Sequence, residues 1–350
     1  MSSHKSRRGW ISRHKALVVL LAITGILVGT VGGWAVYLNE QIASIPRIDL
    51  NLPEDERPQR SGGDGADAVN ILLAGADAGD AGGPSIAETV GSGSWNPGSH
   101  RSDTIMVLHI TADRDQAYLV SIPRDSWVDV PGRGRQKVNA AFSLGGPALY
   151  VQTIEAFTGL RMDHLAIIDW DGFRDLTTAL GGVQIQIPET VRDTGSGTVW
   201  EKGTHTLQGE SALRYVRQRH GLPAGDFDRI KRQQNLMRAM IQGLLSDGAT
   251  RNPVKLTNSL EAITDNLVVD DEFGTGDMRS LALSLRGLRT EDVTFVTIPT
   301  KGLDRIEGQS VVLVDNRQVR DLFGAVLTDD LDVYLEHHDA AVLGAQGSVR

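Results

Sequence analysis

Several kinds of residue are scarce or absent in this chain of 350 residues, and each gap removes a class of function. Cysteine is absent, which excludes disulfide bonds, thiolate metal sites and thiol nucleophiles. Aromatic residues make up only 5%, too few to favour a surface on which bare bases stack. The formal net charge of −9 argues against a general nucleic-acid-binding protein, which carries a dominant basic face, so we expect no nucleic-acid partner.

The N-terminal part of the chain is first basic and then apolar. Segment 16–38 has no charged residue and is long enough to cross a lipid bilayer. Basic residues precede it and Glu40 is the next charge, so the positive-inside rule predicts a cytoplasmic tail over 1–15, a transmembrane helix over 16–38 and an extracellular remainder. Trp34 and Tyr37 lie near the outer end, where interfacial aromatic residues are typical. We therefore predict a single-pass protein of the cell membrane; a cleaved signal peptide is the alternative, which the length of the apolar run disfavours.

Beyond this segment, composition divides the chain into a linker, a large domain and a tail. Residues 39–67 are rich in proline, glycine and charge without a period, which predicts an extracellular stem. Globular signals run over 68–335, and residues 336–350 are predicted to form a frayed tail. Within 68–335, apolar runs typical of strands mix with helical patterns but without a regular βαβ rhythm. We therefore predict an α/β domain of three layers, α/β/α, on a mixed central sheet.

The apolar runs and helical patterns predict individual elements. The expected strands are Ala68–Gly75, Thr104–Thr111, Ala117–Pro123, Leu165–Trp170, Val183–Pro188, Val293–Pro299 and Ser310–Asp315. The expected helices are Ala148–Thr158, Ser211–Gln218, Phe227–Leu245, Val254–Leu267, Met278–Leu288 and Arg317–Leu327. A polar turn between the second and third strands predicts a hairpin, and the aperiodic residues 77–100 predict a long exposed loop.

Positive charge is concentrated in the segment Arg214–Gln234, which holds five arginines, one lysine, two aspartates and three glutamines. On a helix, Arg229 and Gln233 share one stripe with the apolar Leu236 and Met240, which must face the core. A buried, unpaired guanidinium costs several kcal/mol, so the stripe predicts an anionic partner for Arg229. The alternative is that the first helical turn protrudes into water, where arginine needs no such partner.

Other charged residues are placed to join this arginine. Arg217 and Arg219 are two residues apart, so both point the same way if their segment is extended. Asp226 precedes the helix at a position suited to cap it or to orient an arginine. Arg101 opens one strand of the predicted hairpin and Arg124 follows its partner strand, which places both at one end of the sheet. Because the planar arginine fork donates two parallel hydrogen bonds to phosphate, this group favours a pyrophosphate ligand.

Carboxylates beside these arginines favour a divalent cation. Asp77 follows the first strand and Asp103 lies in "RSDT", while Asp80 is the alternative to Asp77. Mg²⁺, or Mn²⁺ in its place, takes one or two carboxylates together with phosphate oxygens and water. Asp125, next to Arg124, is also explained as a turn cap or as the partner of an arginine.

Six segments of the chain together carry a specific pattern. In order they read "NILLAGADAGD", "RSDTIMVLHI", "LVSIPRDSWVDVPGRGRQKVNAAFSLGG", "GLRMDHLAIIDWDGF", "LGGV" and "ALRYVRQRHGLPAGDFDRIKRQQ". Over about Val69–Leu245 they resemble the successive motifs of the LytR-CpsA-Psr family, most specifically through "SIPRD" combined with "RxRxxxxxxDxxRxxRQQ". The resemblance implies an Mg²⁺-dependent enzyme, on the outer face of the membrane, that transfers a wall glycopolymer from a polyprenyl-pyrophosphate carrier to peptidoglycan.

The resemblance also implies roles for the residues above. It implies metal ligation by Asp77 and Asp103, with Asp80 as the alternative to Asp77. It implies that Asp226 is a supporting or proton-handling acid. Catalytic roles fall on Arg101, Arg124, Asp226 and Arg229. The implied contacts to pyrophosphate come from Arg101, Arg124, Arg217, Arg219, Arg229 and Gln233.

Three hypotheses about function follow. In the first, a peptidoglycan hydroxyl attacks the sugar-proximal phosphorus and polyprenyl phosphate leaves, so the chain is a phosphotransferase with possible hydrolysis of pyrophosphate as a side reaction. In the second, the same site uses water, and the chain is a lipid-pyrophosphate phosphatase. In the third, the chain is a membrane-tethered, non-enzymatic protein that binds an anionic wall polymer. The polymer stays open between arabinogalactan, teichoic acid and capsule.

Overall fold

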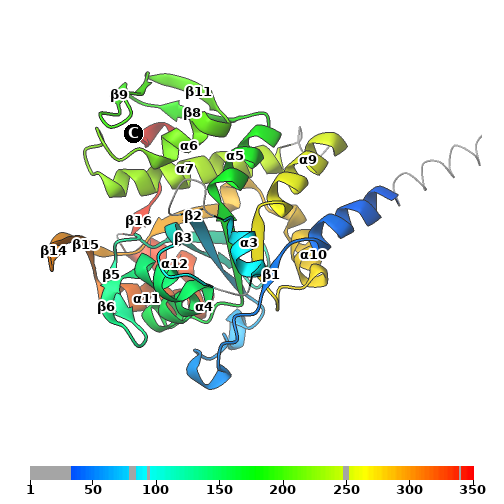
Figure 1. Cartoon of the computed structure of the whole chain (residues 1–350), viewed down its shortest axis with the longest axis vertical. Helices are drawn as coiled ribbons and strands as arrows, with labels where there is room; N and C mark the ends of the chain where they lie inside the picture. Colours follow the sequence, from blue (N-terminus) through cyan, green and yellow to red (C-terminus); the bar gives the residue numbers. More distant parts are fainter. Residues whose placement is uncertain (1–32, 79–83, 93–94, 247–251, 339) are drawn as a thin grey trace, which may run out of the picture. The chain divides into compact units, whose positions relative to one another are not determined.

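The computed structural model describes residues 33–78, 84–92, 95–246, 252–338 and 340–350 (Figure 1). The predicted cytoplasmic tail, most of the predicted transmembrane helix and Asp80 lie outside the described residues. Within those described ranges, no helix is both long enough and apolar enough to cross a bilayer. The transmembrane helix stays a prediction.

The chain separates into two units, Met1–Ser44 and Ile45–Arg350. In the first unit, residues 33–43 are helical, and the Gln41 side chain donates a hydrogen bond to the Tyr37 hydroxyl over 3.1 Å. All the elements named below belong to the second unit.

The second unit is built on an eight-stranded mixed sheet. In spatial order its strands are β1 (Arg47–Ile48), β12 (Leu267–Asp270), β7 (His164–Asp169), β2 (Val69–Ala78), β3 (His100–Ile110), β4 (Ala117–Ser121), β13 (Val293–Thr297) and β16 (Ala341–Val342). β2 runs parallel to β7 and β4 runs parallel to β13, whereas β3 is antiparallel to both β2 and β4. The mixed sheet and the hairpin of β3 and β4 are as predicted.

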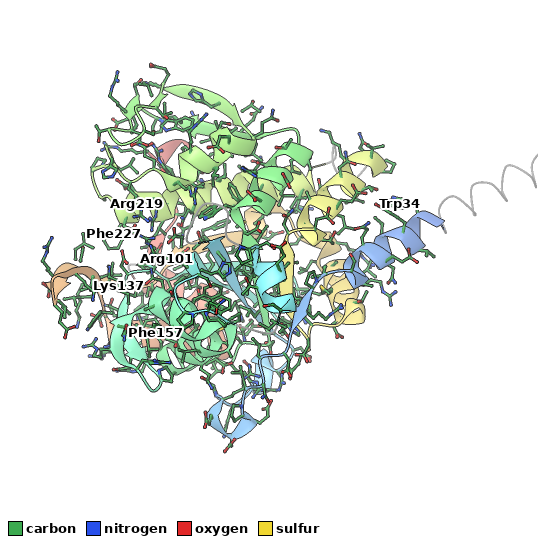
Figure 2. All side chains as sticks on the ribbon, in the orientation of Figure 1. Trp34, Arg101, Lys137, Phe157, Arg219 and Phe227 are labelled. Atoms are coloured by element: carbon green, nitrogen blue, oxygen red, sulfur yellow. The ribbon has the colours of Figure 1, made fainter. Side chains whose placement is uncertain are left out.

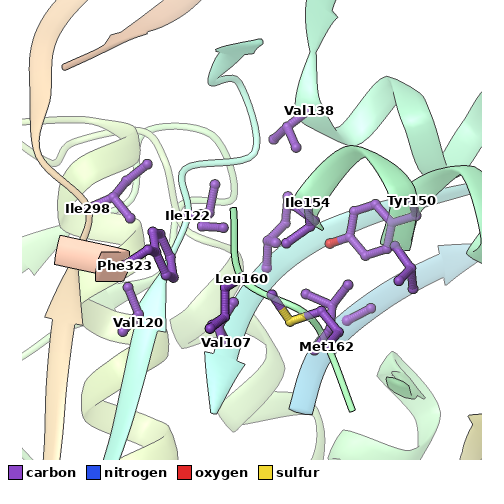
Figure 3. Close-up of a cluster of buried hydrophobic side chains, with 14 of the residues drawn as sticks. Val107, Val120, Ile122, Val138, Tyr150, Ile154, Leu160, Met162, Ile298 and Phe323 are labelled. Atoms are coloured by element: carbon purple, nitrogen blue, oxygen red, sulfur yellow. The ribbon is translucent and has the colours of Figure 1, made fainter. Parts of the chain in front are cut away.

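Alternating side chains of the central strands bury two different faces of the sheet. On one face, Val107 of β3 and Val120 of β4 belong to one apolar cluster with Tyr150 and Phe323, which lie on two helices (Figure 3). On the other face, Met106 of β3 belongs to a cluster that includes residues of two further helices. The first two helices are α4 (Val138–Thr158) and α11 (Asn316–Leu327), and the others are α7 (Asp226–Leu245) and α10 (Thr275–Ser284). Helices therefore pack on both faces of the sheet.

A third apolar cluster joins α7 to the elements that follow β7 in the chain. Tyr215 and Leu236 are fully buried in it. Its elements are α5 (Trp170–Ala179), α6 (Gly209–Arg217), α9 (Pro253–Thr264) and the antiparallel pair of β8 (Val183–Ile187) and β11 (Gly203–Leu207). This cluster holds α5, α6 and α7 together beside the sheet (Figure 1).

The remaining elements are short or peripheral. They are α3 (Ile86–Gly91), β5 (Trp127–Val130), β6 (Gly134–Lys137), β9 (Val191–Arg192), β10 (Val199–Trp200), β14 (Thr300–Ile306), β15 (Gln309–Val314) and α12 (Leu331–His337). Helix α4 consists of two helices joined across a kink at Gly146, with φ of 69° and ψ of −164°. The second of them agrees with the predicted Ala148–Thr158, and the first, from Val138, was not predicted. The predicted helix Val254–Leu267 ends at Thr264 in the structure. Leu267 instead begins strand β12, which was not predicted.

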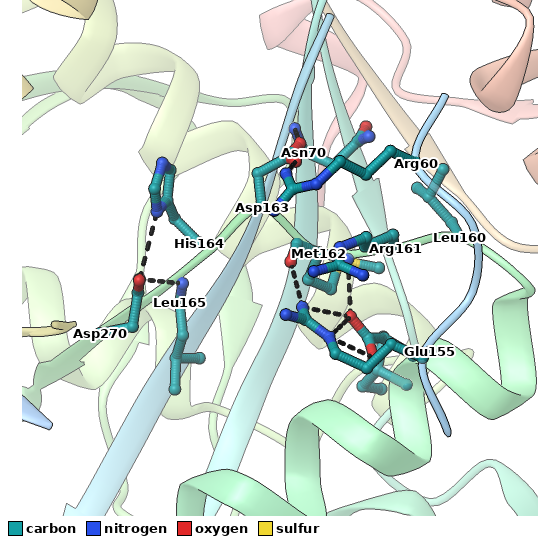
Figure 4. A network of polar contacts seen from close by, with 12 residues as sticks. Arg60, Asn70, Glu155, Leu160, Arg161, Met162, Asp163, His164, Leu165 and Asp270 are labelled. Atoms are coloured by element: carbon teal, nitrogen blue, oxygen red, sulfur yellow. Dashed lines mark hydrogen bonds and ion pairs between the residues drawn. The ribbon is translucent and has the colours of Figure 1, made fainter. Parts of the chain in front are cut away.

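The segment predicted as a stem contributes to the second unit. β1 pairs with β12 at the edge of the sheet. The Arg57 side chain, 8% exposed, donates from Nη2 to Glu155 Oε1 over 2.7 Å and to the Met162 backbone oxygen over 2.6 Å (Glu155 and Met162 are labelled in Figure 4). Arg60 pairs with Asp163 at 3.2 Å. The residues that pair with Arg57 and Arg60 lie about 100 positions later in the chain. The composition of the segment gives no sign of these partners, so it predicted a solvent-exposed stem.

The described residues of segment 336–350, which was predicted as a frayed tail, also make contacts with the rest of the second unit. β16 pairs with β13, and Val349 is only 2% exposed. The Gln346 side chain donates to the backbone oxygen of Gln184 over 2.5 Å. These contacts join distant parts of the chain and leave no periodic pattern in the segment itself, which is why the sequence did not predict them.

Candidate active site

A β-bulge determines where the Asp103 carboxylate lies. Gly75 of β2 faces Thr104 of β3 and Ala76 faces Ser102, so Asp103 is the extra residue on β3. Because a bulge interrupts strand alternation, Asp103 and Thr104 both lie on the side of the sheet where α6 and α7 pack, whereas buried Ser102 contacts α4 on the other side. A Cβ at Gly75 would lie 2.9 Å from the Thr104 side chain, so glycine permits this close approach.

Arg124, which follows β4, makes an ion pair with Asp103. Both side chains are mostly buried, with exposed fractions of 14% and 18%. The Nε atom of Arg124 has no hydrogen-bond partner among the described residues. Neighbouring Asp125 pairs with Lys137 at 3.1 Å and with Arg124 Nε at 3.8 Å, which confirms the interpretation of Asp125 as the partner of an arginine.

The end of α6 orients two arginines. Gln218 follows the helix in extended conformation, with φ of −60° and ψ of 130°, and is only 2% exposed. Since alternate residues of an extended segment point the same way, Arg217 and Arg219 share one direction and Gln218 takes the other. The Arg217 guanidinium carbon lies 4.9 Å from the centre of the Trp170 ring, a cation–π geometry.

The first turns of α7 supply the third part of the site. Arg229, 3% exposed, makes an ion pair with Asp226 at 2.6 Å. The Arg229 Nε and the Asp226 Oδ2 are buried without a hydrogen-bond partner among the residues that the structure describes. Gln233, one turn later, is also buried. Gly225 is the N-cap residue, so Asp226 does not cap the helix and instead takes the alternative role of orienting an arginine.

Burial and mutual repulsion make this group of guanidinium ions unfavourable on its own. Burial lowers the pKa of Arg229 to about 10 against the opposing effect of Asp226, and the charges of Arg124 and Arg219 lower it further. Burial, followed by the charge of Arg124, also lowers the pKa of Arg219. A multiply charged anion beside these groups would favour their charged forms.

Two cavities meet at these residues. The first, which we call the polar cavity, has a volume of about 240 Å³ and is lined by Asp103, Trp170, Val216, Arg217, Arg219, Arg229 and Gln233. The second, which we call the apolar cavity, has a volume of about 230 Å³. Its walls come from the sheet and from α5, α6, α7 and α9, and include Leu73, Met106, Phe173, Met237, Met240 and Ile263. Trp170, Val216 and Gln233 line both cavities, so the two are adjacent.

The structure thus groups most of the residues singled out from the sequence. Arg124 and Asp226 do not line the polar cavity themselves but are ion-paired with its lining residues Asp103 and Arg229. Arg101 does not line it either: it is exposed on β3, at the same end of the sheet as Arg124 (Arg101 and Arg219 are labelled in Figure 2). Asp77, near the end of β2, pairs through its backbone with Arg101, and its side chain lies outside what the structure describes. The catalytic and binding roles of all these residues stay predictions.

One described carboxylate of the predicted metal site, that of Asp103, lines the polar cavity. The strand register places Asp77 opposite Arg101, two residues before Asp103. No group of three His, Asp or Glu side chains suited to a metal occurs among the described residues. Mg²⁺ is commonly held by one or two carboxylates with phosphate oxygens and water, so Asp103 is of the residue type that such an ion binds.

Trp170 is a site residue that the sequence did not reveal. It directly follows β7 and begins α5, where an apolar residue is usually part of the core. In the structure it lies under Arg217 and between the two cavities. Its indole Nε1 is buried and has no hydrogen-bond partner in the described part of the chain.

Comparisons with known proteins give the chain its relatives. Residues 40–326 match the LytR_cpsA_psr family. The chain is 32% identical over 346 residues to the cell wall biosynthesis protein LcpA of Corynebacterium glutamicum, covering 90% of this chain and 66% of that protein. It is 34% identical over 218 residues to the polyisoprenyl-teichoic acid–peptidoglycan teichoic acid transferase TagU of Enterococcus faecalis, covering 62% of this chain and 65% of TagU. The chain therefore spans about two thirds of the length of these relatives.

A solved structure shares the fold. The LytR-Csp2A-Psr enzyme from Actinomyces oris matches with a TM-score of 0.62 and 22% sequence identity, covering 81% of this chain and 96% of that chain. At this level of identity, the likeness establishes the arrangement of the sheet and helices.

Proposed function

The chain belongs to the LytR-CpsA-Psr family, and we propose that it is a phosphotransferase that moves a glycopolymer from a polyprenyl-pyrophosphate carrier onto a peptidoglycan hydroxyl. The observation that carries this proposal is the junction of the polar and apolar cavities at Trp170, Val216 and Gln233. A ligand with a diphosphate group and a hydrocarbon chain matches this pair of cavities. The name of the related TagU protein describes a transfer from a polyisoprenyl-linked polymer to peptidoglycan, which supports the same proposal.

The charges of the polar cavity suit a diphosphate diester, which carries two negative charges. Arg217, Arg219, Arg229 and Asp103 line the cavity, and two ion pairs extend this group: Asp103 with Arg124 and Arg229 with Asp226. Burial and the charges of neighbouring arginines lower the pKa of Arg219 and Arg229, so a negatively charged ligand would favour their charged forms. The ligand would also supply acceptors for the Nε atoms of Arg124 and Arg229, which have no hydrogen-bond partner among the described residues.

The residues around the cavity act mainly by alignment and charge stabilisation. The acceptor hydroxyl forms a bond to the sugar-proximal phosphorus, and the bond from that phosphorus to the bridging oxygen breaks. The electron pair of that bond leaves with polyprenyl phosphate, while the arginines stabilise the charge on the phosphoryl oxygens. Asp226 holds Arg229 with one oxygen, and its second oxygen is assigned to the handling of the hydroxyl proton.

In this proposal Asp103 and Asp77 would hold Mg²⁺ or Mn²⁺. When bound, the ion would neutralise charge on the diphosphate. Arg101, exposed at the same end of the sheet, is assigned to the phosphate on the side open to solvent. The segment 16–38 is proposed to anchor the chain in the cell membrane, with the catalytic unit outside. Arabinogalactan, teichoic acid and capsule all remain candidates for the polymer.

Product analysis tests the proposed reaction. The purified full chain is incubated with a short-chain polyprenyl-pyrophosphate glycan, Mg²⁺ and peptidoglycan, and the products are separated and analysed. We expect glycan linked through phosphate to muramic acid. Free glycan phosphate without linkage to peptidoglycan would identify a hydrolase, and binding without turnover would identify a non-enzymatic wall protein.

A further inference from the structure

Arg232 belongs to the arginine-rich motif, yet within the described chain it lines neither the polar nor the apolar cavity. Its side chain is fully buried, at 0% exposure. It donates from Nη1 to the side-chain oxygen of Gln218 over 2.6 Å and from Nε to the backbone oxygen of Arg350 over 2.6 Å. Its guanidinium carbon lies 4.5 Å from the centre of the Tyr215 ring. Since Arg232 lines neither cavity, any effect that it has on a bound ligand passes through the residues that it contacts.

The contact with Gln218 falls between two arginines of the polar cavity. Gln218 separates Arg217 from Arg219 and points away from the cavity. Both ends of its amide are engaged, because Oε1 accepts from Arg232 and Nε2 donates to the His220 backbone oxygen over 2.8 Å. Rotation of this segment would break at least one of these bonds. The direction of both cavity arginines therefore depends on the amide between them.

Arg232 also lies on the helix that carries other cavity residues. It directly precedes Gln233 and follows Arg229 by three positions on α7. Backbone hydrogen bonds keep one helical turn stiff, so Arg232 moves together with both neighbours. Its bond to Gln218 consequently fixes the α7 residues relative to those at the end of α6.

We propose that Arg232 is a positioning residue that locks the Arg217–Arg219 segment onto α7, so that guanidinium groups from two elements reach one diphosphate. This inference rests on the proposed function and adds to it a residue that touches no substrate. The Tyr215 ring and the Arg350 backbone oxygen hold the guanidinium in the orientation that reaches Gln218.

Variants on both sides of the bond test the inference through pyrophosphate affinity. Arg232→Met keeps much of the side-chain length and removes the donors, while Gln218→Ala removes the acceptor. The purified full chain is titrated calorimetrically with inorganic pyrophosphate in the presence of Mg²⁺. We expect each variant to bind about tenfold more weakly, since a misplacement on the order of 1 Å is costly at such a site. Wild-type affinity in Gln218→Ala would overturn the inference, and this variant decides the matter if Arg232→Met does not fold.

The double variant separates positioning from a general loss of packing. If Arg232 acts through Gln218, the double variant of Arg232→Met and Gln218→Ala should bind pyrophosphate no more than about twofold more weakly than the single variant with the lower affinity. Losses that multiply would show that the two residues act independently and would overturn the inference.

Arg238→Met is the matched control. Arg238 lies on the same helix and donates to the Gly344 backbone oxygen over 2.8 Å and to the Asn235 side chain over 2.6 Å, without contact to Gln218. We expect its pyrophosphate affinity to stay within about twofold of the wild type. A loss equal to that of Arg232→Met would overturn the assignment of a specific role to Arg232.

Arg217→Ala distinguishes failure of this inference from failure of the proposed function. If Arg217→Ala loses binding while Arg232→Met and Gln218→Ala bind like the wild type, only the inference about Arg232 is wrong. If Arg217→Ala itself binds pyrophosphate normally, the polar cavity is not the diphosphate site, and both proposals are wrong.

Discussion

Arginine side chains are buried both near Glu155 and around the polar cavity of the second unit, and the charges next to them differ between these two regions. Arg57 has its counter-charge within the chain: its Nε and Nη2 atoms both bond to Glu155, which is only 2% exposed. Around the polar cavity, by contrast, buried arginines lie close to one another: the charges of Arg124 and Arg219 lower the pKa of Arg229, and the Nε atoms of Arg124 and Arg229 lack a hydrogen-bond partner among the described residues.

This difference separates a structural tie from a binding site. A guanidinium whose donors are all bonded to a carboxylate has no donor free for a ligand. Substitution of that arginine leaves the carboxylate buried without its counter-charge. A group of arginines that repel one another is stabilised when an anion binds beside them. Loss of a residue from the first region should therefore reduce stability, and loss from the second should reduce catalysis.

Arg124→Ala is expected to have the largest effect on turnover. It removes a buried cation that the proposal places on the diphosphate, and loss of one such donor commonly costs about 10²–10³-fold in rate. Transfer of glycan to peptidoglycan is measured beside thermal unfolding, which should change little because Asp103, left without Arg124, still interacts favourably with Arg219 and Arg229. Turnover equal to that of the wild type would rule out the assigned role.

Arg57→Met should show the opposite pattern. Removal of one partner from a buried ion pair costs about 3–5 kcal/mol in the free energy of unfolding, because Glu155 stays buried without its counter-charge. Urea denaturation measures this loss, while the turnover of the folded protein should stay close to the wild type. The control is Arg60→Ala. Because the Arg60 side chain is 62% exposed, loss of its pair with Asp163 should lower the free energy of unfolding by at most about 1 kcal/mol. Equal losses in both variants would contradict the distinction between a buried and an exposed pair.

Trp170→Leu should have the smallest of the three effects. It removes the ring beneath Arg217 but keeps an apolar side chain between the cavities. A cation–π contact contributes about 0.5–2 kcal/mol, so we expect KM for the lipid-linked donor to rise about two- to thirtyfold with little change in kcat. Trp170→Phe, which keeps an aromatic face, should lie between the two proteins. If Phe and Leu have the same effect, the ring face does not support Arg217.

The sequence indicated the residues that line the polar cavity better than it indicated their geometry. The arginine-rich motif identified Arg217, Arg219, Arg229 and Gln233, and the i,i+2 spacing indicated correctly that the first two share a direction. It could not predict that Asp103 is the extra residue of a bulge, because a register shift depends on the partner strand. It also gave no sign that Trp170 separates two cavities, since an aromatic residue after a strand is usually part of the core.

The fold was predicted in its class but not at its margins. Alternating apolar runs indicated the central strands and the mixed sheet, because those strands carry their own pattern. The segment around Arg57 and the residues after 335 are held by bonds to Glu155, Gln184 and other distant partners, and such bonds leave no local pattern. Single-sequence periodicity therefore cannot find elements whose stability comes from elsewhere in the chain.

The most direct test of the account is a crystal structure of the full chain with a short-chain polyprenyl pyrophosphate and Mg²⁺. We expect the diphosphate to contact Arg124, Arg217, Arg219 and Arg229 in the polar cavity, with the hydrocarbon passing Trp170 into the apolar cavity. Binding of the diphosphate elsewhere, or a hydrocarbon chain that never enters the apolar cavity, would contradict the claim that these two cavities form one site for a lipid diphosphate.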